Sequence, residues 1–252
     1  MGGRRRAMTD MERKDESARM ERSARMIGED GLRRLSEARV AVFGLGGVGS
    51  SCVEALARAG VGTLVLVDRD AVEESNINRQ AIAFYSTIGK RKVDVMASMV
   101  RDIAPGTRIV AHDAFVTADN VGDFLEGPVD FIVDAVDTVT TKLALASYAE
   151  KRGIAFVGSM GAANKCHPEM LAFADIYQTQ SCPLCRSVRK LARKQGIEAM
   201  HVLYSSEQPV AVAAAEGSMR RERTELGTLS FMPPIMGQMI AGDVIRSIVG
   251  IA

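Results

Sequence analysis

A glycine-rich segment, Gly44-Leu45-Gly46-Gly47-Val48-Gly49, lies between the apolar run 40–43 and a stretch of helical periodicity at 47–59. Glycine allows a sharp turn and brings backbone N–H groups close to phosphate oxygens, while the N-terminus of the following helix adds positive potential. Asp68 ends the next apolar run, where a carboxylate accepts hydrogen bonds from ribose hydroxyls. The pattern predicts a nucleotide site formed by Gly44, Gly46, Gly47, Gly49 and Asp68. A tight turn that binds nothing is the alternative.

Two polar segments follow this motif along the chain. Asn76-Ile77-Asn78-Arg79-Gln80 combines a guanidinium with amides, which suit phosphate oxygens or purine edges, although an ordinary polar loop has the same composition. Gly89-Lys90-Arg91-Lys92 opens a predicted helix at 90–103, and cations there oppose the helix dipole. An anion is therefore expected nearby, and we predict that Arg79 and Lys92 contact a polyphosphate and stabilise charge on it.

A pair of carboxylates, Asp134 and Asp137, follows the fourth apolar run at 131–133. The carboxyl ends of parallel strands form the ligand edge of an α/β sheet, where such carboxylates hold Mg²⁺ beside a triphosphate. Capping of the next helix by Asp137 explains the pair equally well. We predict Asp137 as the metal ligand.

Taken together, these residues favour ATP, with chemistry at a phosphoryl group, over a dinucleotide. Hydride transfer to or from NAD requires neither the cations nor the second carboxylate pair. An NAD-dependent oxidoreductase and a nucleotide-sensing module without turnover remain as alternatives.

The same combination resembles the ThiF/MoeB/HesA family, the relatives of ubiquitin-activating enzymes, over about Arg19 to Ala252. The resemblance implies a homodimer in which an N-terminal arginine of one subunit reaches the ATP of the other. Arg22 is the expected arginine, with Arg25 as its competitor. The segments that carry the resemblance are Gly44–Gly49, Asp68 with Asp70, Asn76 to Gln80 with Asn78 and Arg79 inside it, Gly89-x-x-Lys92 and Asp134-x-x-Asp137.

Within that family, three parts of the chain are similar to the tRNA threonylcarbamoyladenosine dehydratases: 39–44, 175–177 with 182–184, and 227–234. This similarity implies that ATP adenylates the threonylcarbamoyl carboxylate on a tRNA adenosine and that an internal nucleophile then closes a ring. A carboxylate is a poor electrophile until it is adenylated, and an intramolecular second step gains from proximity. A sulfur-carrier or ubiquitin-like-protein adenylyltransferase with the same ATP site is the alternative, and a cysteine desulfurase or other sulfur-relay partner stays open.

A predicted helix at 183–195 carries five cations on one face, because they recur at i, i+3, i+4, i+7 and i+8. Such a stripe follows a tRNA phosphate backbone and makes binding depend strongly on salt. A solvated charged face is the alternative. The five residues are Arg186, Arg189, Lys190, Arg193 and Lys194.

The four cysteines and the absence of a signal peptide favour a reducing compartment, the cytoplasm. Cys182-Pro183-Leu184-Cys185 resembles half of the structural zinc site of several family members. No cysteine follows Cys185, so the four-cysteine site of those members cannot form. Two thiols at a helix start, an unusual zinc site completed by Cys166 and His167, and a catalytic Cys182 or Cys185 remain open.

Composition and periodicity predict the scaffold. The chain has 252 residues, 47% hydrophobic and 25% charged, with a formal net charge of +1, which excludes a uniformly basic nucleic-acid coat. No apolar run reaches the ~18 residues of a membrane span. Apolar runs alternating with helices predict an α/β, Rossmann-like fold: a mostly parallel sheet with helices on both faces, C-terminal strands and a closing helix.

We expect residues 1–18 to be a disordered extension, 19–252 to be a single ATP-binding adenylating domain, and 205–227 to be a mobile loop. Expected strands are 40–43, 64–67, 108–111, 131–133, 154–157, 170–173 and 202–204, and expected helices are 47–59, 90–103, 138–152, 183–195 and 234–249.

Overall fold

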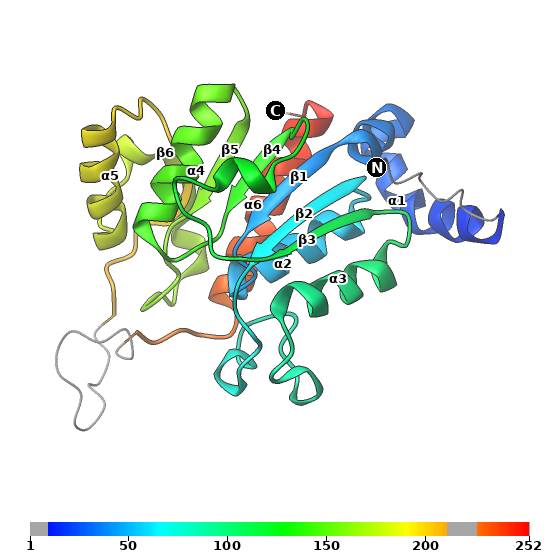
Figure 1. The fold of residues 1–252 in the computed structure, drawn as a ribbon, viewed down its shortest axis with the longest axis horizontal. Helices are drawn as coiled ribbons and strands as arrows, with labels where there is room; N and C mark the ends of the chain where they lie inside the picture. The colour runs from blue at the N-terminus through cyan, green and yellow to red at the C-terminus, as the bar shows by residue number, and fades with distance from the viewer. Residues whose placement is uncertain (1–9, 211–225, 252) are drawn as a thin grey trace.

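The computed structural model describes residues 10–210 and 226–251. Within them the chain forms one sheet of seven strands in the order β3-β2-β1-β4-β5-β7-β6, with helices packed on both faces (Figure 1). Neighbouring strands run parallel except β6, which is antiparallel to β7. The α/β, Rossmann-like fold expected from the sequence is confirmed. The strands are β1 Arg39–Phe43, β2 Thr63–Asp68, β3 Arg108–Asp113, β4 Phe131–Asp134, β5 Ala155–Ser159, β6 Leu171–Asp175 and β7 His201–Ser205.

The central strands are apolar on both sides because each side is covered. In β1, Val40 and Val42 join a core beneath α2 (Gly47–Arg58), α3 (Lys92–Ile103) and α6 (Met232–Val249). Ala41 and Phe43 point to the opposite face, where they join a second core with α4 (Val139–Arg152). Successive side chains of a strand point to opposite faces, so one strand serves both cores.

The carboxyl ends of the parallel strands position the site. β1 is flanked by β2 on one side and by β4 on the other, with Phe43 in register with Val67 and Asp134. The connections therefore diverge from β1, and the crevice at such a switch point is where open α/β sheets bind ligands. The backbone continues the pairing past the strand ends: Gly44 N–H donates to the Val67 carbonyl at 2.8 Å.

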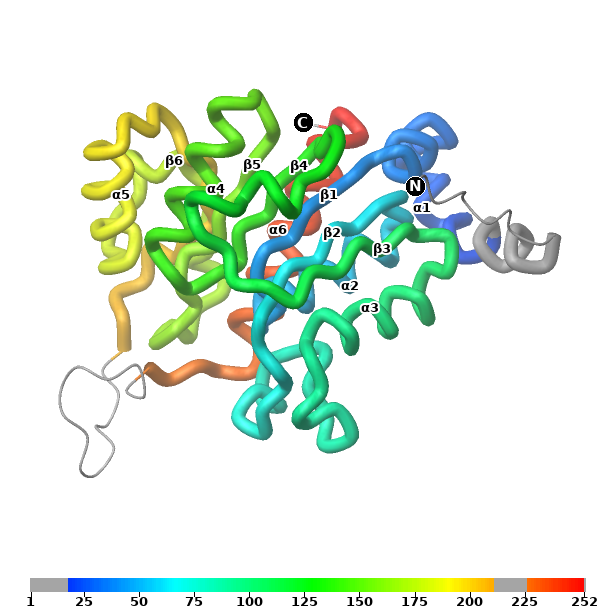
Figure 2. Tube along the Cα trace, in the orientation of Figure 1, coloured from blue at the N-terminus to red at the C-terminus, as the bar shows by residue number. Residues whose placement is uncertain are grey.

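Helix α6 braces the start of α2. A side chain at Gly237 would begin 2.3 Å from the Val48 carbonyl oxygen, and one at Gly47 would begin 2.7 Å from Pro233 Cβ. Backbone-close packing of this kind requires glycine at both positions. The turn before α2 is therefore packed against α6, the last helix of the chain (Figure 2).

The N-terminal segment differs from the expectation. Helix α1, Asp10–Glu37, begins inside the stretch expected to be disordered, and Gly28 with φ +67° interrupts it. Residues 1–9 lie outside the described residues. The same holds for 211–225 of the expected mobile loop, so that prediction is untested there. None of the helices in the described part of the chain is long and apolar enough to span a membrane.

Candidate functional site

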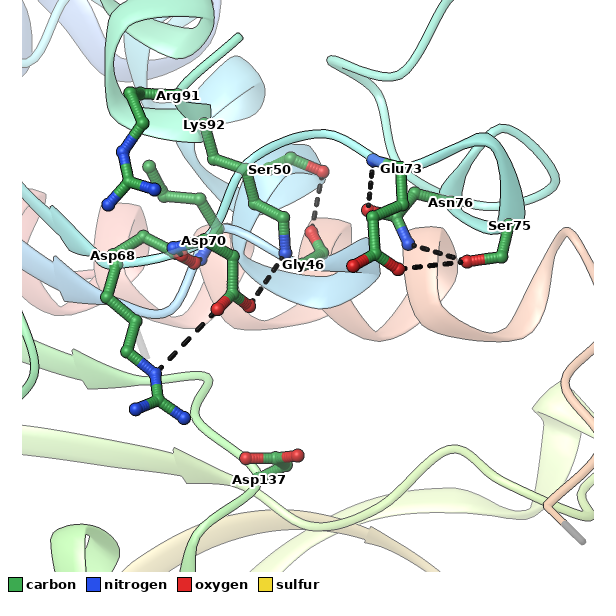
Figure 3. Close-up of polar contacts among 12 residues, drawn as sticks. Gly46, Ser50, Asp68, Asp70, Glu73, Ser75, Asn76, Arg91, Lys92 and Asp137 are labelled. Carbon is green, nitrogen blue, oxygen red and sulfur yellow. Dashed lines mark hydrogen bonds and ion pairs between the residues drawn. The ribbon is translucent and has the colours of Figure 1, made fainter. Parts of the chain in front are cut away.

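The glycine-rich turn is closed on itself and tied to the end of β2. Gly44 has φ +87°, and a side chain at Gly49 would begin 1.8 Å from the Gly44 carbonyl oxygen. Asp68 accepts from the Leu45 N–H at 2.6 Å through Oδ2 and from the Asp70 N–H at 2.8 Å through Oδ1. A carboxylate has about four lone-pair sites, so Asp68 can fix the turn and still accept from a ribose. Figure 3 shows Asp68 and Asp70 together at this edge.

The N-terminus of α2 opens onto free space. The first N–H groups of any α-helix have no intrahelical acceptor, and Gly46, the N-cap, supplies no side-chain acceptor for them. The nearest heavy atom to an added Gly46 side chain is Gln80 Nε2, at 3.9 Å. Gln80 is buried, and its Oε1 has no hydrogen-bond partner in the described structure. Uncapped backbone donors with an amide beside them are the kind of groups that bind phosphate at a helix N-terminus. The sequence had marked Gln80 only as one member of a polar segment.

Arg79 lies beside this opening. Its Cγ is 3.3 Å from where a Gly47 side chain would begin. Its Nη1 donates to the Ser75 carbonyl at 3.0 Å and to Asn78 Oδ1 at 2.7 Å. Asn78 Nδ2 in turn donates to the Thr228 carbonyl at 3.2 Å, so Asn78 links the segment to the chain that leads into α6. The guanidinium is thereby pre-oriented next to the glycine turn.

Asn76 is placed differently from the expectation of direct nucleotide contact. Its side chain is buried, and Oδ1 accepts from the Glu73 N–H at 3.2 Å, which caps the short turn Glu74–Asn76. Figure 3 shows this cap with Glu73 and Ser75. Asn76 therefore shapes the loop that carries Asn78 and Arg79.

The cations at the start of α3 already have carboxylate partners. Lys92 Nζ, nearly buried, lies 3.1 Å from Asp70 Oδ2 (Figure 3). Arg91, the N-cap, pairs with Asp113 through Nε–Oδ2 at 2.6 Å and through a second contact from Nη2, and this guanidinium holds the pKa of Asp113 below its ordinary value. Part of the negative charge expected near these cations is therefore supplied by carboxylates of the protein itself. Lys92 thus lies beside Asp70, whose carboxylate is largely exposed.

The two carboxylates after β4 have separate roles. Asp134 is fully buried, and Lys142 Nζ lies 3.1 and 3.3 Å from its two oxygens and donates to the Ser159 carbonyl at 2.6 Å. Burial raises the pKa of Asp134, and Lys142 opposes that shift. Asp137 is exposed and accepts from Thr138 Oγ1 at 3.1 Å. Figure 3 shows it on the β4 side of the crevice, across from Asp70.

Asp137 fits a magnesium ion only in company with a nucleotide. The described residues contain no group of three His, Cys, Asp or Glu side chains that could hold a metal. Mg²⁺ commonly takes one or two carboxylates and completes its octahedron with phosphate oxygens and water. An exposed carboxylate such as Asp137 is compatible with that donor set.

Lys142 is the residue that sequence reasoning missed. It occupies a core position of α4, because buried Leu145, Ala146 and Ala149 follow it at i+3, i+4 and i+7. A lysine at a helix's apolar positions is the signal that could have revealed a buried partner, since lysine is almost never buried unless it is paired.

Arg22 is not brought to the site of its own chain. Arg19, one turn before it, donates through Nη1 to the carbonyls of Ala57 and Arg58, at the C-terminal end of α2. The glycine turn lies at the other end of this helix, about 18 Å away at 1.5 Å per residue. Arg22 is exposed at that remote end.

The basic stripe on α5 (Pro183–Gln195) is exposed with one exception. Cys185, Val188 and Ala192 face the core, opposite the stripe. Arg189 instead donates through Nη1 to the carbonyls of Ile176 and Thr179, at 3.2 and 2.8 Å, and so serves the fold. The exposed members are Arg186, Lys190, Arg193 and Lys194.

Known proteins resemble this chain along most of its length. It is 38% identical over 231 residues to a tRNA threonylcarbamoyladenosine dehydratase of Bacillus subtilis, across 88% of this chain and 91% of the relative. The E. coli protein of the same name is 38% identical over 168 residues, across 67% of this chain and 63% of that protein.

Solved structures match the whole architecture. E. coli tRNA N6-threonylcarbamoyladenosine dehydratase, TcdA, in complex with ATP superposes with a TM-score of 0.85 at 28% identity, covering 97% of this chain and 98% of that one. Its AMP complex gives 0.86 at 29% identity over the same shares. The model of the ThiF family matches residues 20–252, and the chain belongs to the ThiF family.

Proposed function

We propose that this chain is an ATP-dependent tRNA threonylcarbamoyladenosine dehydratase. The observation that carries the proposal is the near-complete similarity, in sequence and in fold, to dehydratases that include a structure with ATP. The open N-terminus of α2, with Arg79 and Gln80 beside it, provides a phosphate site where such an enzyme needs one.

Different residues of the crevice contact different parts of ATP during adenylation. The N–H groups after Gly46, together with Arg79 and Lys92, bind the phosphates and stabilise the charge that grows on the departing pyrophosphate. Asp68 and Asp70 accept hydrogen bonds from the ribose, and Asn78 keeps Arg79 oriented. Asp137 would hold a Mg²⁺ ion, which would supply further neutralisation of the phosphate oxygens.

The chemistry converts a stable carboxylate into a good electrophile. A carboxylate oxygen of the threonylcarbamoyl group attacks the α-phosphorus, the bond to pyrophosphate breaks, and an acyl adenylate forms. A nucleophile within the same modification then attacks the acyl carbon and AMP leaves with the former carboxylate oxygen. The second step is intramolecular and gains from proximity, so it requires no nucleophile from the protein.

A second candidate, adenylation of a sulfur carrier or ubiquitin-like protein, has one observation in its favour. The chain is 37% identical over 131 residues to the SAMP-activating enzyme E1 of Haloferax volcanii, across 52% of this chain and 48% of that protein. The dehydratase match covers far more of both chains, so the dehydratase is preferred.

The assembly and setting form part of the proposal. We propose a homodimer in which Arg22 of one subunit reaches the ATP of the other, tRNA as the macromolecular substrate along α5, and the cytoplasm as the compartment. Free thiols at Cys52, Cys166, Cys182 and Cys185 suit a reducing compartment. None of the described residues indicates a sulfur-relay partner such as a cysteine desulfurase.

Pyrophosphate release tests the proposal. The protein is incubated with labelled ATP and, in separate reactions, tRNA carrying threonylcarbamoyladenosine, the same tRNA without the modification, and a carrier protein with a Gly-Gly tail. We expect release only with the modified tRNA, together with loss of one water from its modified nucleoside by mass spectrometry. Pyrophosphate release that does not depend on tRNA, or that requires the carrier protein, would disprove the dehydratase assignment.

A further inference from the structure

Two thiols share the first turn of α5. Cys182 is the N-cap of this helix and Cys185 lies three residues on; the Cys185 N–H donates to Cys182 Sγ at 3.5 Å. Both are free, and both pack in the hydrophobic cluster with Leu143, Met160 and Val188. Cys182 keeps 7% of its surface exposed and Cys185 keeps 1%.

The two sulfurs have opposite proton affinities. A hydrogen bond from the Cys185 thiol, aided by the backbone N–H groups of Cys185 and Leu184 and by the nearby Lys165 ammonium, lowers the pKa of Cys182 to about 6, although burial opposes the shift. The same thiol–thiol hydrogen bond and burial raise the pKa of Cys185. The shift favours a thiolate at Cys182 beside a thiol at Cys185, and the thiolate is the reactive form.

The described surroundings of the pair do not favour a metal site. The described residues provide no third His, Cys, Asp or Glu for a metal at this place. Of the remaining cysteines, Cys52 is buried in α2, where burial raises its pKa, and Cys166 is half-buried. Two cysteines at i and i+3 on a helix start match the geometry of thiol–disulfide couples.

We propose that Cys182 and Cys185 form a reversible dithiol–disulfide couple that reacts with hydroperoxides. The Cys182 thiolate attacks the terminal peroxide oxygen; a sulfur–oxygen bond forms, the oxygen–oxygen bond breaks, and the alkoxide or hydroxide leaves and takes up a proton. The Cys185 sulfur then attacks the sulfur of the resulting sulfenic acid. The disulfide forms, the sulfur–oxygen bond breaks, and the oxygen leaves as water with the proton of Cys185.

Oxidation changes the start of α5 in a defined way. The anionic N-cap acceptor of the Cys185 N–H becomes a neutral disulfide sulfur, and Lys165 loses the negative charge it faces. The sulfur chemistry is independent of the proposed tRNA activity, because it requires only the protein, a peroxide and a thiol reductant.

The test is a thiol count with peptide mapping on the full-length reduced protein. Hydrogen peroxide treatment, denaturation and alkylation should lower the titratable thiols from the four of the reduced chain to two. A peptide carrying the intrachain Cys182–Cys185 disulfide should appear, and dithiothreitol should restore all four thiols. In Cys185→Ser, dimedone should trap a sulfenic acid at Cys182, whereas Cys182→Ser should leave Cys185 reduced.

The variant Cys166→Ser is the matched control and should form the same disulfide. Circular dichroism on each variant separates chemistry from misfolding. The proposal is overturned if Cys182 and Cys185 stay reduced in the folded wild-type protein while Cys166 is oxidised, or if only intermolecular disulfides form. Because no readout involves tRNA or ATP, failure of the proposed dehydratase activity would leave this result unaffected.

Discussion

Gly46 and Gly49 belong to the same turn but are glycines for different reasons. A side chain at Gly49 would overlap the Gly44 carbonyl oxygen at 1.8 Å, whereas at Gly46 the nearest atom is 3.9 Å away. Glycine at position 49 is required for the fold of the turn, whereas glycine at position 46 leaves space at the N-terminus of α2.

The two positions predict a matched pair of variants. Gly49→Ala should lower the melting temperature and distort the turn, because backbone atoms cannot move aside cheaply. Gly46→Ala should melt close to wild type but bind ATP more weakly, since its methyl group occupies the space of the ligand. Calorimetry on both variants, for melting and for ATP titration, checks this, and equal melting temperatures would contradict it.

Arg79 is the residue on which adenylation should depend most. Arg79→Ala removes the guanidinium beside the glycine turn, so we expect ATP–pyrophosphate exchange to fall by at least about 10²-fold, as for the loss of a transition-state donor. The fold should survive because the side chain is only partly buried. Exchange rates and melting curves measure both effects, with Arg101→Ala, an exposed arginine in the last turn of α3, as the control. Wild-type exchange in Arg79→Ala would disprove the assignment.

Lys142 should be worth more to the fold than any exposed ion pair. Lys142→Met leaves Asp134 buried without its cation, which typically costs about 3–5 kcal/mol. Burial already raises the pKa of Asp134, and loss of Lys142 raises it further. The variant's deficit should therefore be largest at high pH, where Asp134 is ionised, and shrink as pH falls and Asp134 takes up a proton. Urea unfolding at several pH values measures this. The double variant Lys142→Met with Asp134→Leu should recover much of the loss, and a pH-independent deficit would exclude the buried pair as its cause.

For individual residues, the sequence predicts features that are formed by residues close together in the chain. The glycine turn and Asp68 could be identified because strand, turn and helix follow one another within 30 residues. The burial of Lys142 against Asp134 and Ser159 depends on contacts between α4, β4 and β5. The unpaired Gln80 Oε1 depends on how the segment after Asn76 lies beside Gly46. The charges at Lys90 to Lys92 illustrate the limit: the dipole argument required an anion, and Asp70 and Asp113 supply part of it.

Among the elements, α5 combines a packing face with a charged face. Its expected bounds, 183–195, agree with the structure because proline starts it and Gly196, in the left-handed conformation, ends it. The helix α1 and the antiparallel direction of β6 did not follow from the sequence. The polar residues of α1 carry little periodicity, and the direction of an edge strand is set by where the chain returns to the sheet.

The exposed stripe predicts the salt dependence of tRNA binding. The triple variant Arg186→Gln, Lys190→Gln, Lys194→Gln should reduce the slope of log affinity against log salt by roughly two to three, since each lost phosphate contact removes 0.7–0.9. Arg189→Gln is the control: it should lower the melting temperature, because Arg189 holds Ile176 and Thr179, and leave the slope unchanged. An unchanged slope in the triple variant would refute the stripe as a tRNA surface.

On the scale of the whole molecule, the site is separated from Arg22 by the length of α2. If Arg22 acts across a dimer, Arg22→Ala and Arg79→Ala variants should each be inactive and should regain activity when mixed. Random exchange of subunits gives about a quarter of the sites an intact Arg79 and a partner with an intact Arg22. Exchange activity after co-refolding measures this. No recovery, with mixed dimers demonstrated by mass spectrometry, would place Arg22 outside the reaction.

The brace between α6 and α2 sets an order of events during synthesis. Gly47 packs on Pro233 and Val48 on Gly237, so the glycine-rich turn near the start of the fold receives its support from residues made about 190 positions later. At 5–20 residues per second, translation leaves that turn without its brace for roughly 10–40 s. A nascent chain halted before Met232 should therefore fail to be retained by immobilised ATP, and retention should begin only once α6 has cleared the ribosome.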